Sequence, residues 1–326
     1  MQGDLIVVFG GSGFIGKQVV RTLAKRGKRV RVPMRRPHLG AELRVLGDVG
    51  QIQLVQANVR YPESIARALE GATGAVNCIG LLSESGPQTF SAVQAEGAAA
   101  IAREAAAKGI TRLVQVSAIG ADARSPSRYA RTKADAEEAV RQAVPSAAIV
   151  RPSIVFGPED TFFNRFADMA KFAPALPLIG GGKTKFQPIY VQDAAEAIAN
   201  ALDLESARGR VFEIGGPRVY TFKELLQFTL RESARRRPLI PLPFFMAQPM
   251  GMLLDWTFKL IPFFDAPLTG DQVLMLKRDS VVAAQGVGTI ADLGVSELES
   301  VEAIVPGYLW RFRPHGQFEA REAKAA

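Results

Sequence analysis

The sequence predicts an α/β protein with a doubly wound parallel sheet and a smaller, mostly helical C-terminal region. Two observations support this fold class. A glycine turn at residues 10–16 joins an apolar run, Leu5–Phe9, to a helical pattern, and short apolar runs then alternate with helical patterns along the chain. Strands that alternate with helices form parallel sheets, which bind ligands at the carboxyl ends of their strands. We therefore predict a Rossmann sheet.

Each glycine of the turn has its own expected role. Gly10 allows the sharp turn out of the strand, Gly13 lets a phosphate approach the backbone, and Gly16 lets the helix lie close to the sheet. A pyrophosphate there would accept hydrogen bonds from N–H groups at the positive end of the helix dipole. An ordinary glycine-rich loop is the alternative. The predicted dinucleotide site of this turn comprises Gly10, Ser12, Gly13, Phe14, Ile15 and Gly16.

The next helix and strand lead to a pair of arginines. Residues 17–27 have the pattern of a helix that ends at Gly27, and the strand Arg29–Met34 is followed by Arg35 and Arg36. In an NAD-binding unit, an acidic residue about 20 residues beyond the glycines binds the ribose hydroxyls, whereas arginine suits a 2′-phosphate. Since no acid stands here, the sequence favours NADPH (or NADP+) over NAD(H). A solvated charge pair at a strand end is the alternative.

Further strand ends add candidate residues to the nucleotide site. The elements predicted after the arginine pair are a strand at 52–55, a helix at 62–69, a strand at 74–79, a helix at 88–108 and a strand at 113–116. A nicotinamide ribose would lie at the end of the fourth strand. Cys78, in an apolar run, is expected to be a small buried residue and not a nucleophile. The candidates that follow these strands or end them are Asn58, Val59, Cys78, Ile79, Gly80 and Ser117.

A tyrosine and a lysine follow the fifth strand. Ser125 and Pro126 predict a helix start, with serine as the N-cap and proline as the first helical residue. Tyr129 and Lys133 then share one helix face. A lysine ammonium near a phenol lowers the pKa of the phenol, so Tyr129 could exchange a proton with a carbonyl or an alcohol. An ordinary surface pair is the alternative.

Composition limits the classes of function. A chain of 326 residues with 48% hydrophobic and 22% charged residues is globular, and its net charge of +8 favours acidic partners such as phosphate ligands, nucleic acid or an anionic membrane. One cysteine and two histidines predict neither a disulfide framework nor a metal site. Without a recognition motif, nucleic acid is not an expected partner. The first strand begins at the N-terminus, so we expect no signal peptide and a cytoplasmic location.

The motifs together resemble the extended or atypical short-chain dehydrogenases/reductases. The resemblance rests on the glycine pattern, the Tyr129-x-x-x-Lys133 pair and the segment 151–158, and it covers about residues 4–220. It implies that Pro152 and Ile154 border the nucleotide. It also implies a catalytic set in which Tyr129 is the general acid/base, Lys133 lowers its pKa and holds the ribose, and Ser117 orients the substrate oxygen.

This chain departs from the pattern of that superfamily at several positions. Ala118 and Ile119 follow Ser117 where a run of hydroxyl residues is usual, Gln94 stands where Asn is common, and Asn58 stands where many members have Asp. The cofactor pocket is therefore expected to be intact, and the proton-transfer machinery only partly so.

Within the superfamily, the segment 116–133 most resembles the NADPH-binding accessory subunits of respiratory complex I and their bacterial relatives. This resemblance implies an NADP(H)-binding subunit whose nucleotide is mainly structural and whose partners are complex I subunits. It would be peripheral on the inner face of the plasma membrane or on the matrix side of the inner mitochondrial membrane. The alternative is an NADP-dependent reductase or epimerase of the short-chain dehydrogenase type that acts on an apolar, quinone- or isoprenoid-like substrate.

The C-terminal third is expected to form a substrate or docking region. We predict a nucleotide-binding domain at 1–152, to which segments of 188–216 return, a substrate or docking region at 153–187 and 217–315, and a mobile tail at 316–326. Residues 239–268 are apolar but too interrupted by prolines and charges for a transmembrane helix.

Two interpretations of residues 239–268 stay open. They could form a helical cap that lines a pocket, or a surface that rests on an anionic membrane or on a membrane-protein partner. In the second case, the basic run Arg235–Arg237 and the basic and aromatic run Trp310–Arg313 would flank the surface.

Overall fold

The computed structural model describes residues 4–259 and 268–318 of the 326-residue chain. Within them the main sheet has seven parallel strands in the order β11-β6-β5-β4-β1-β2-β3. These strands are β1 (Leu5–Phe9), β2 (Arg29–Met34), β3 (Ile52–Gln56), β4 (Gly74–Asn77), β5 (Leu113–Val116), β6 (Ala148–Pro152) and β11 (Val211–Ile214). The predicted doubly wound Rossmann sheet is confirmed.

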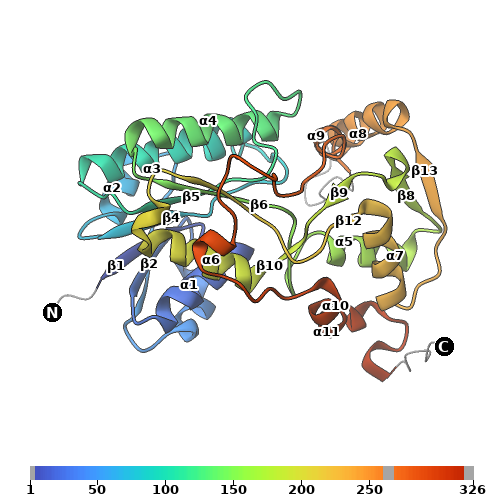
Figure 1. Cartoon of the computed structure of the whole chain (residues 1–326), viewed down its shortest axis with the longest axis horizontal. Coiled ribbons are helices and arrows are strands. Elements are labelled where there is room, and N and C mark those ends of the chain that lie inside the picture. The colour runs from blue at the N-terminus through green and yellow to red at the C-terminus, as the bar shows by residue number, and fades with distance from the viewer. Residues whose placement is uncertain (1–3, 260–267, 319–326) are drawn as a thin grey trace.

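Helices cover both faces of this sheet (Figure 1). One face carries α1 (Phe14–Lys25) and α6 (Val191–Asp203), and the other carries α2 (Pro62–Ala68), α3 (Glu96–Ala107) and α4 (Arg128–Ala143). Side chains along β1 alternate between the two cores, so that Ile6 and Val8 pack with the first pair of helices and Val7 and Phe9 with the other three. A parallel sheet buried on both faces needs such a continuous apolar strand.

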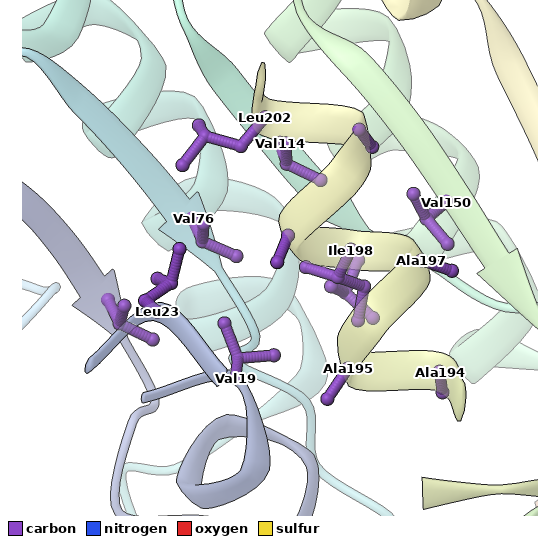
Figure 2. Close-up of a cluster of buried hydrophobic side chains, with 14 of the residues drawn as sticks. Val19, Leu23, Val76, Val114, Val150, Ala194, Ala195, Ala197, Ile198 and Leu202 are labelled. Carbon is purple, nitrogen blue, oxygen red and sulfur yellow. The ribbon is translucent and has the colours of Figure 1, made fainter. Parts of the chain in front are cut away.

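Close packing joins α1 and α6 to the sheet. The helices contribute valine, leucine, isoleucine and alanine, and the strands contribute mainly valine and isoleucine. Small alanines on α6 let this helix approach the sheet and α1 closely. Figure 2 labels Val19, Leu23, Val76, Val114, Val150, Ala194, Ala195, Ala197, Ile198 and Leu202 in this core.

A second, smaller lobe lies beyond the carboxyl ends of the strands (Figure 1). Its helices are α5 (Phe163–Phe172), α7 (Phe222–Glu232), α8 (Phe244–Lys259), α9 (Gly270–Met275), α10 (Val301–Ile304) and α11 (Pro306–Leu309). Short strands form two-stranded ladders, namely β7 (Val155–Phe156) with β10 (Ile189–Tyr190), β9 (Lys185–Phe186) with β12 (Tyr220–Thr221), and β8 (Leu176–Ile179) with β13 (Leu239–Leu242). Its aromatic core includes Phe163 and Phe222. None of the helices in the described ranges has the length and hydrophobicity needed to cross a bilayer.

Three predicted boundaries are wrong, each because of a side-chain hydrogen bond. The strand predicted to reach residue 79 ends at Asn77, whose side-chain oxygen accepts the N–H of Ile79 and turns the chain. The helix predicted at 88–108 begins as a π-helical turn at 90–95, capped by Thr89. The helix predicted from Pro126 begins at Arg128. Its N-cap is Ser127, which accepts the N–H of Ala130 at 3.2 Å.

The run Trp310–Arg313 does not flank residues 239–268. Phe312 is buried in the lobe core, Arg311 donates to the carbonyl oxygen of Pro158, and Arg313 donates to that of Glu232. These contacts hold the C-terminal segment on the lobe, and Figure 1 shows α10 and α11 at the end opposite to α8 and α9. Residues 260–267 and most of the predicted mobile tail, 319–326, lie outside the described residues.

Candidate functional site

The glycine turn is built around the carbonyl oxygen of Gly10. Gly10 has φ +74°, and its oxygen accepts the N–H of Gly13 at 2.9 Å. A Cβ on Gly16 would overlap this oxygen, whereas a Cβ on Gly13 would meet it only at 3.3 Å. Gly11 also lies close to the sheet, because a Cβ there would lie 2.8 Å from Val32 of β2. Gly16 is required by the turn itself.

The N-terminus of α1 fits an anion. Its N-cap, Gly13, offers no side chain, and the first turn of the helix contains no acidic residue. The N–H groups at this end therefore lack a side-chain cap within the described residues, and the helix dipole adds partial positive charge. Such an end is suited to hold a pyrophosphate.

A cavity of about 610 Å³ runs from this helix end into the second lobe. Its volume is within the range of small-molecule sites. The cavity brings together many residues that the sequence analysis selected from distant segments. The predicted residues in its lining are Gly13, Phe14, Ile15, Gly16, Cys78, Gly80, Ser117, Tyr129, Lys133, Pro152 and Ile154.

Other predicted residues lie outside the cavity lining. Gly10 and Ile79 pack against each other at the turn, because a Cβ on Gly10 would lie 3.0 Å from the nitrogen of Ile79. Asn58 caps a local turn by accepting the N–H of Arg60 at 3.1 Å, and Val59 packs against Gly97.

Three more predicted residues are exposed. Ser12 lies at the tip of the glycine turn, and Arg35 and Arg36 follow β2 at the edge of the sheet where β1 also ends. Neither guanidinium has a hydrogen-bond or ion-pair partner among the described residues.

Ser117, Tyr129 and Lys133 line one wall of the cavity. The Nζ atom of Lys133 is 5.8 Å from the centroid of the Tyr129 ring and donates to the carbonyl oxygen of Val116 at 3.3 Å. Ser117 is 4% exposed, and its hydroxyl has no hydrogen-bond partner in the part of the chain that the structure describes. A buried hydroxyl normally has a partner. The orphaned oxygen fits a polar atom of a ligand in the cavity, and the open glycine turn fits a bound dinucleotide, so the residues present suit that cofactor.

The pKa values at this wall differ from the prediction. Burial, and then the charge of Asp271, raise the pKa of Tyr129 to about 12. Burial lowers the pKa of Lys133 to about 8, although Glu137 opposes this shift. The prediction that Lys133 lowers the pKa of Tyr129 is therefore wrong for this structure, and the neutral phenol is a hydrogen-bond donor. Burial also raises the pKa of Cys78 to about 12, as suits a buried thiol that is not a nucleophile.

Gln94, which stands where related proteins often have Asn, is buried in the π-helical turn. Its side-chain oxygen accepts the N–H of Leu81 at 3.2 Å, and its nitrogen donates to the hydroxyl of Thr132 at 3.3 Å. Gln94 therefore connects the loop after β4 to α4.

The sequence analysis missed Asp271, which joins the two lobes at this site. Its carboxylate accepts hydrogen bonds from the Ser127 hydroxyl at 2.7 Å, the Arg128 N–H at 2.7 Å and the Tyr129 N–H at 3.2 Å. These bonds place a negative charge at the positive end of α4. A capping-box pattern at 269–272 signals the start of α9 in the sequence, but it does not reveal the partner of Asp271.

The apolar part of the cavity was also missed. It is lined by side chains of the second lobe, including Phe162, Phe166, Met169, Leu254 and Met275. These residues come from α5, α8, α9 and the segment before α5, so no local pattern in the sequence groups them.

The sheet order, the glycine turn and the Tyr129–Lys133 pair beside the fifth strand define a dinucleotide-binding protein of the short-chain dehydrogenase/reductase type. The chain belongs to the NAD dependent epimerase/dehydratase family, whose sequence model matches residues 6–215. The predicted superfamily is thus confirmed.

Two relatives give a more specific similarity than the family does. The chain is 37% identical over 318 residues to NADH dehydrogenase (ubiquinone) 1 alpha subcomplex subunit 9, mitochondrial, of Arabidopsis thaliana, covering 94% of this chain and 77% of that protein. It is 34% identical over 330 residues to the Rattus norvegicus protein of the same name, covering 99% and 86%. The more specific resemblance predicted from the sequence is confirmed by these relatives.

A solved structure supports the fold alone. The UDP-glucose 4-epimerase of Thermus thermophilus in complex with NAD has a TM-score of 0.66 and 19% identity, covering 95% of this chain and 99% of that one.

We predict different outcomes for alanine at Gly16 and at Gly13. Gly16→Ala should lower the free energy of unfolding by about 2 kcal/mol or more, because its Cβ overlaps the Gly10 oxygen. Gly13→Ala should leave stability nearly unchanged, since its φ of −85° suits any residue, but should weaken NADPH binding at least tenfold. Urea unfolding and fluorescence titration measure the two effects. Equal losses of stability would contradict the assignment.

Lys133→Met should stabilise the nucleotide-free protein in a pH-dependent way. The pKa of this lysine is about 8 in the folded protein, below the ordinary 10.5, so burying the ammonium costs stability below about pH 8. This cost disappears as pH rises from about 8 to 10.5. The variant should gain on the order of 2 kcal/mol at pH 7 and much less at pH 10. The exposed Lys183→Met is the control. A gain of equal size at both pH values would refute the prediction.

Proposed function

We propose that this protein is an NADP(H)-binding accessory subunit of respiratory complex I, with a nucleotide that is mainly structural. The observation that carries this proposal is the extent of the similarity. Relatives named as subunits of NADH dehydrogenase match 94% and 99% of this chain, which includes the C-terminal lobe as well as the nucleotide-binding sheet. A shared cofactor fold alone would not explain similarity in the lobe.

The site chemistry favours binding over turnover. When bound, NADPH supplies a hydride donor. The chain supplies a cradle at Gly13, an ammonium at Lys133 and a hydrogen-bond donor at Tyr129. The phenol stays protonated well above neutral pH, and Ala118 and Ile119, which directly follow Ser117, carry no hydroxyl. This set can hold and orient a nucleotide between the two lobes, and it supports the accessory-subunit function better than the alternative reductase or epimerase.

NADP(H) is the nucleotide that the exposed arginines favour. Arg35 and Arg36 lie at the carboxyl end of β2, next to the strand that enters the glycine turn, and their guanidinium groups have no partner among the described residues. Two such cations suit a 2′-phosphate.

An exposed apolar face on α8 supports a peripheral position on an anionic membrane. Phe245, Met246, Met252 and Leu253 are 77%, 51%, 57% and 61% exposed, and their spacing places them on one side of the helix. No charged residue occurs in α8 before Asp255.

Positive charge accompanies this face. Lys277 is exposed and its Nζ lies 5.8 Å from the Phe244 ring, so positive charge stands beside the apolar face. Of the predicted basic run, Arg235 and Arg237 donate to the carbonyl oxygens of Phe312 and Ala170 and thus also anchor the lobe. An apolar helix face next to cations suits an anionic bilayer surface. We place it on the cytoplasmic side of the bacterial plasma membrane or the matrix side of the inner mitochondrial membrane.

Replacing the arginine pair should change nucleotide preference. Arg35→Ala with Arg36→Ala should weaken NADPH binding about tenfold to a hundredfold, because charge-assisted bonds to the 2′-phosphate are lost, and should leave NADH binding nearly unchanged. Arg29→Ala, which removes an exposed arginine at the amino end of the same strand, is the matched control. Calorimetric titration with both nucleotides measures the change. Parallel losses for both nucleotides would reject a 2′-phosphate contact.

The protein solubilised from native membranes in mild detergent should co-migrate with NADH:quinone oxidoreductase activity on native gels.

Leu253→Asp should reduce the binding of the protein to anionic vesicles several-fold, since it places a charge on the apolar face of α8. Val45→Asp, at an even more exposed apolar position on the other lobe, should have little effect. If the wild-type protein never co-migrates with the oxidoreductase, the proposed function fails.

A further inference from the structure

The cavity extends well beyond the groups that a nucleotide would use. Its far part is walled by Phe162, Phe166 and Met169 on one side and by Leu254 and Met275 on the other. Phenylalanine and methionine side chains accept long apolar molecules without demanding one shape.

The charged groups in this lining are already engaged. Arg278 pairs with Asp122 at 3.1 Å, the Asp279 carboxylate accepts the N–H of Lys185 at 2.8 Å, and Asp271 caps α4. Arg165 also has an interaction partner. The phenylalanine, methionine and leucine side chains that wall the far part are apolar, and they would disfavour a sugar or another polyhydroxyl ligand.

One polar atom at the inner end lacks a partner. The Ser117 hydroxyl is buried, lines the cavity and makes no hydrogen bond within the described residues. It can donate to one carbonyl or hydroxyl oxygen.

The cavity reaches the surface at α8. Met250 lines the cavity and is also 39% exposed, one helical turn after Met246 on α8. A molecule entering past Met250 would pass from α8 into the apolar part of the cavity.

We propose that this part of the cavity binds the hydrocarbon chain of a lipid that carries one carbonyl or hydroxyl oxygen, with the oxygen at Ser117 and the entrance at Met250. The site needs no turnover of the nucleotide. It rests on the proposed function only for the source of the lipid, which is the membrane beneath α8.

Titration of the purified, NADPH-loaded protein with methyl ketones of increasing chain length, in the absence of vesicles, tests this site. Affinity should rise about three- to fourfold for each added methylene, because each one is buried in the apolar part. Ser117→Ala should weaken all members by a similar factor and leave the dependence on chain length unchanged. Failure of any ketone to bind, or affinity independent of chain length, would overturn the proposal.

Two exposed methionines on different faces of α8 locate the entrance. Met250→Asp should weaken binding of the longest ketone at least tenfold, whereas Met252→Asp, which is exposed but outside the cavity lining, should not. Equal losses would place the chain on the surface of α8 and overturn the proposal. NADPH affinity and unfolding midpoints of both variants show whether the fold is intact.

The type of hydrocarbon chain is decided by comparing geranylacetone with the straight-chain methyl ketone that has the same number of carbon atoms. Tighter binding of one of them identifies an acyl or an isoprenoid lipid, and either ranking supports the site. Since no vesicle is present, failure of membrane docking or of complex I association would leave these titrations unaffected.

Discussion

The contact between the start of α1 and the carbonyl oxygen of Gly10 is the constraint on which the nucleotide end of the site depends. Because residue 16 carries no Cβ, the helix begins immediately after β1, with its N–H groups at the edge of the sheet. The same turn contacts Ile79, which follows β4. In the sheet, β1 lies between β4 and β2. Ligands bind where the strand order reverses in this way.

A second constraint comes from the other lobe. The N-terminus of α4 receives Asp271 from α9, and the neighbouring Gly270 is held by Asp255 and Gln248 of α8. The helix that carries Tyr129 and Lys133 is therefore anchored by the lobe that exposes the apolar face of α8. A protein whose nucleotide stabilises a docking surface needs such a connection. The free energy of nucleotide binding can change the conformation of that surface only through groups that link the nucleotide to it.

Several features of the site cost stability. Lys133 is buried with a lowered pKa, Ser117 leaves its hydroxyl without a partner, and α8 exposes large apolar side chains. Their presence together in and beside one cavity fits a binding role. Arg151, by contrast, forms two hydrogen bonds to the buried Glu137 and stabilises α4 on the sheet.

The sequence by itself determined the sheet, the glycine turn, the pairing of Tyr129 with Lys133 and the family, because these depend on patterns within a few residues or on motifs in a known order. Tertiary structure decided the rest. Asp271 caps a helix 144 residues away in sequence, and its charge together with burial reverses the expected pKa shift of Tyr129. The apolar part of the cavity likewise joins α5, α8 and α9, and electrostatics and cavity shape depend on contacts between such distant segments, which local patterns do not encode.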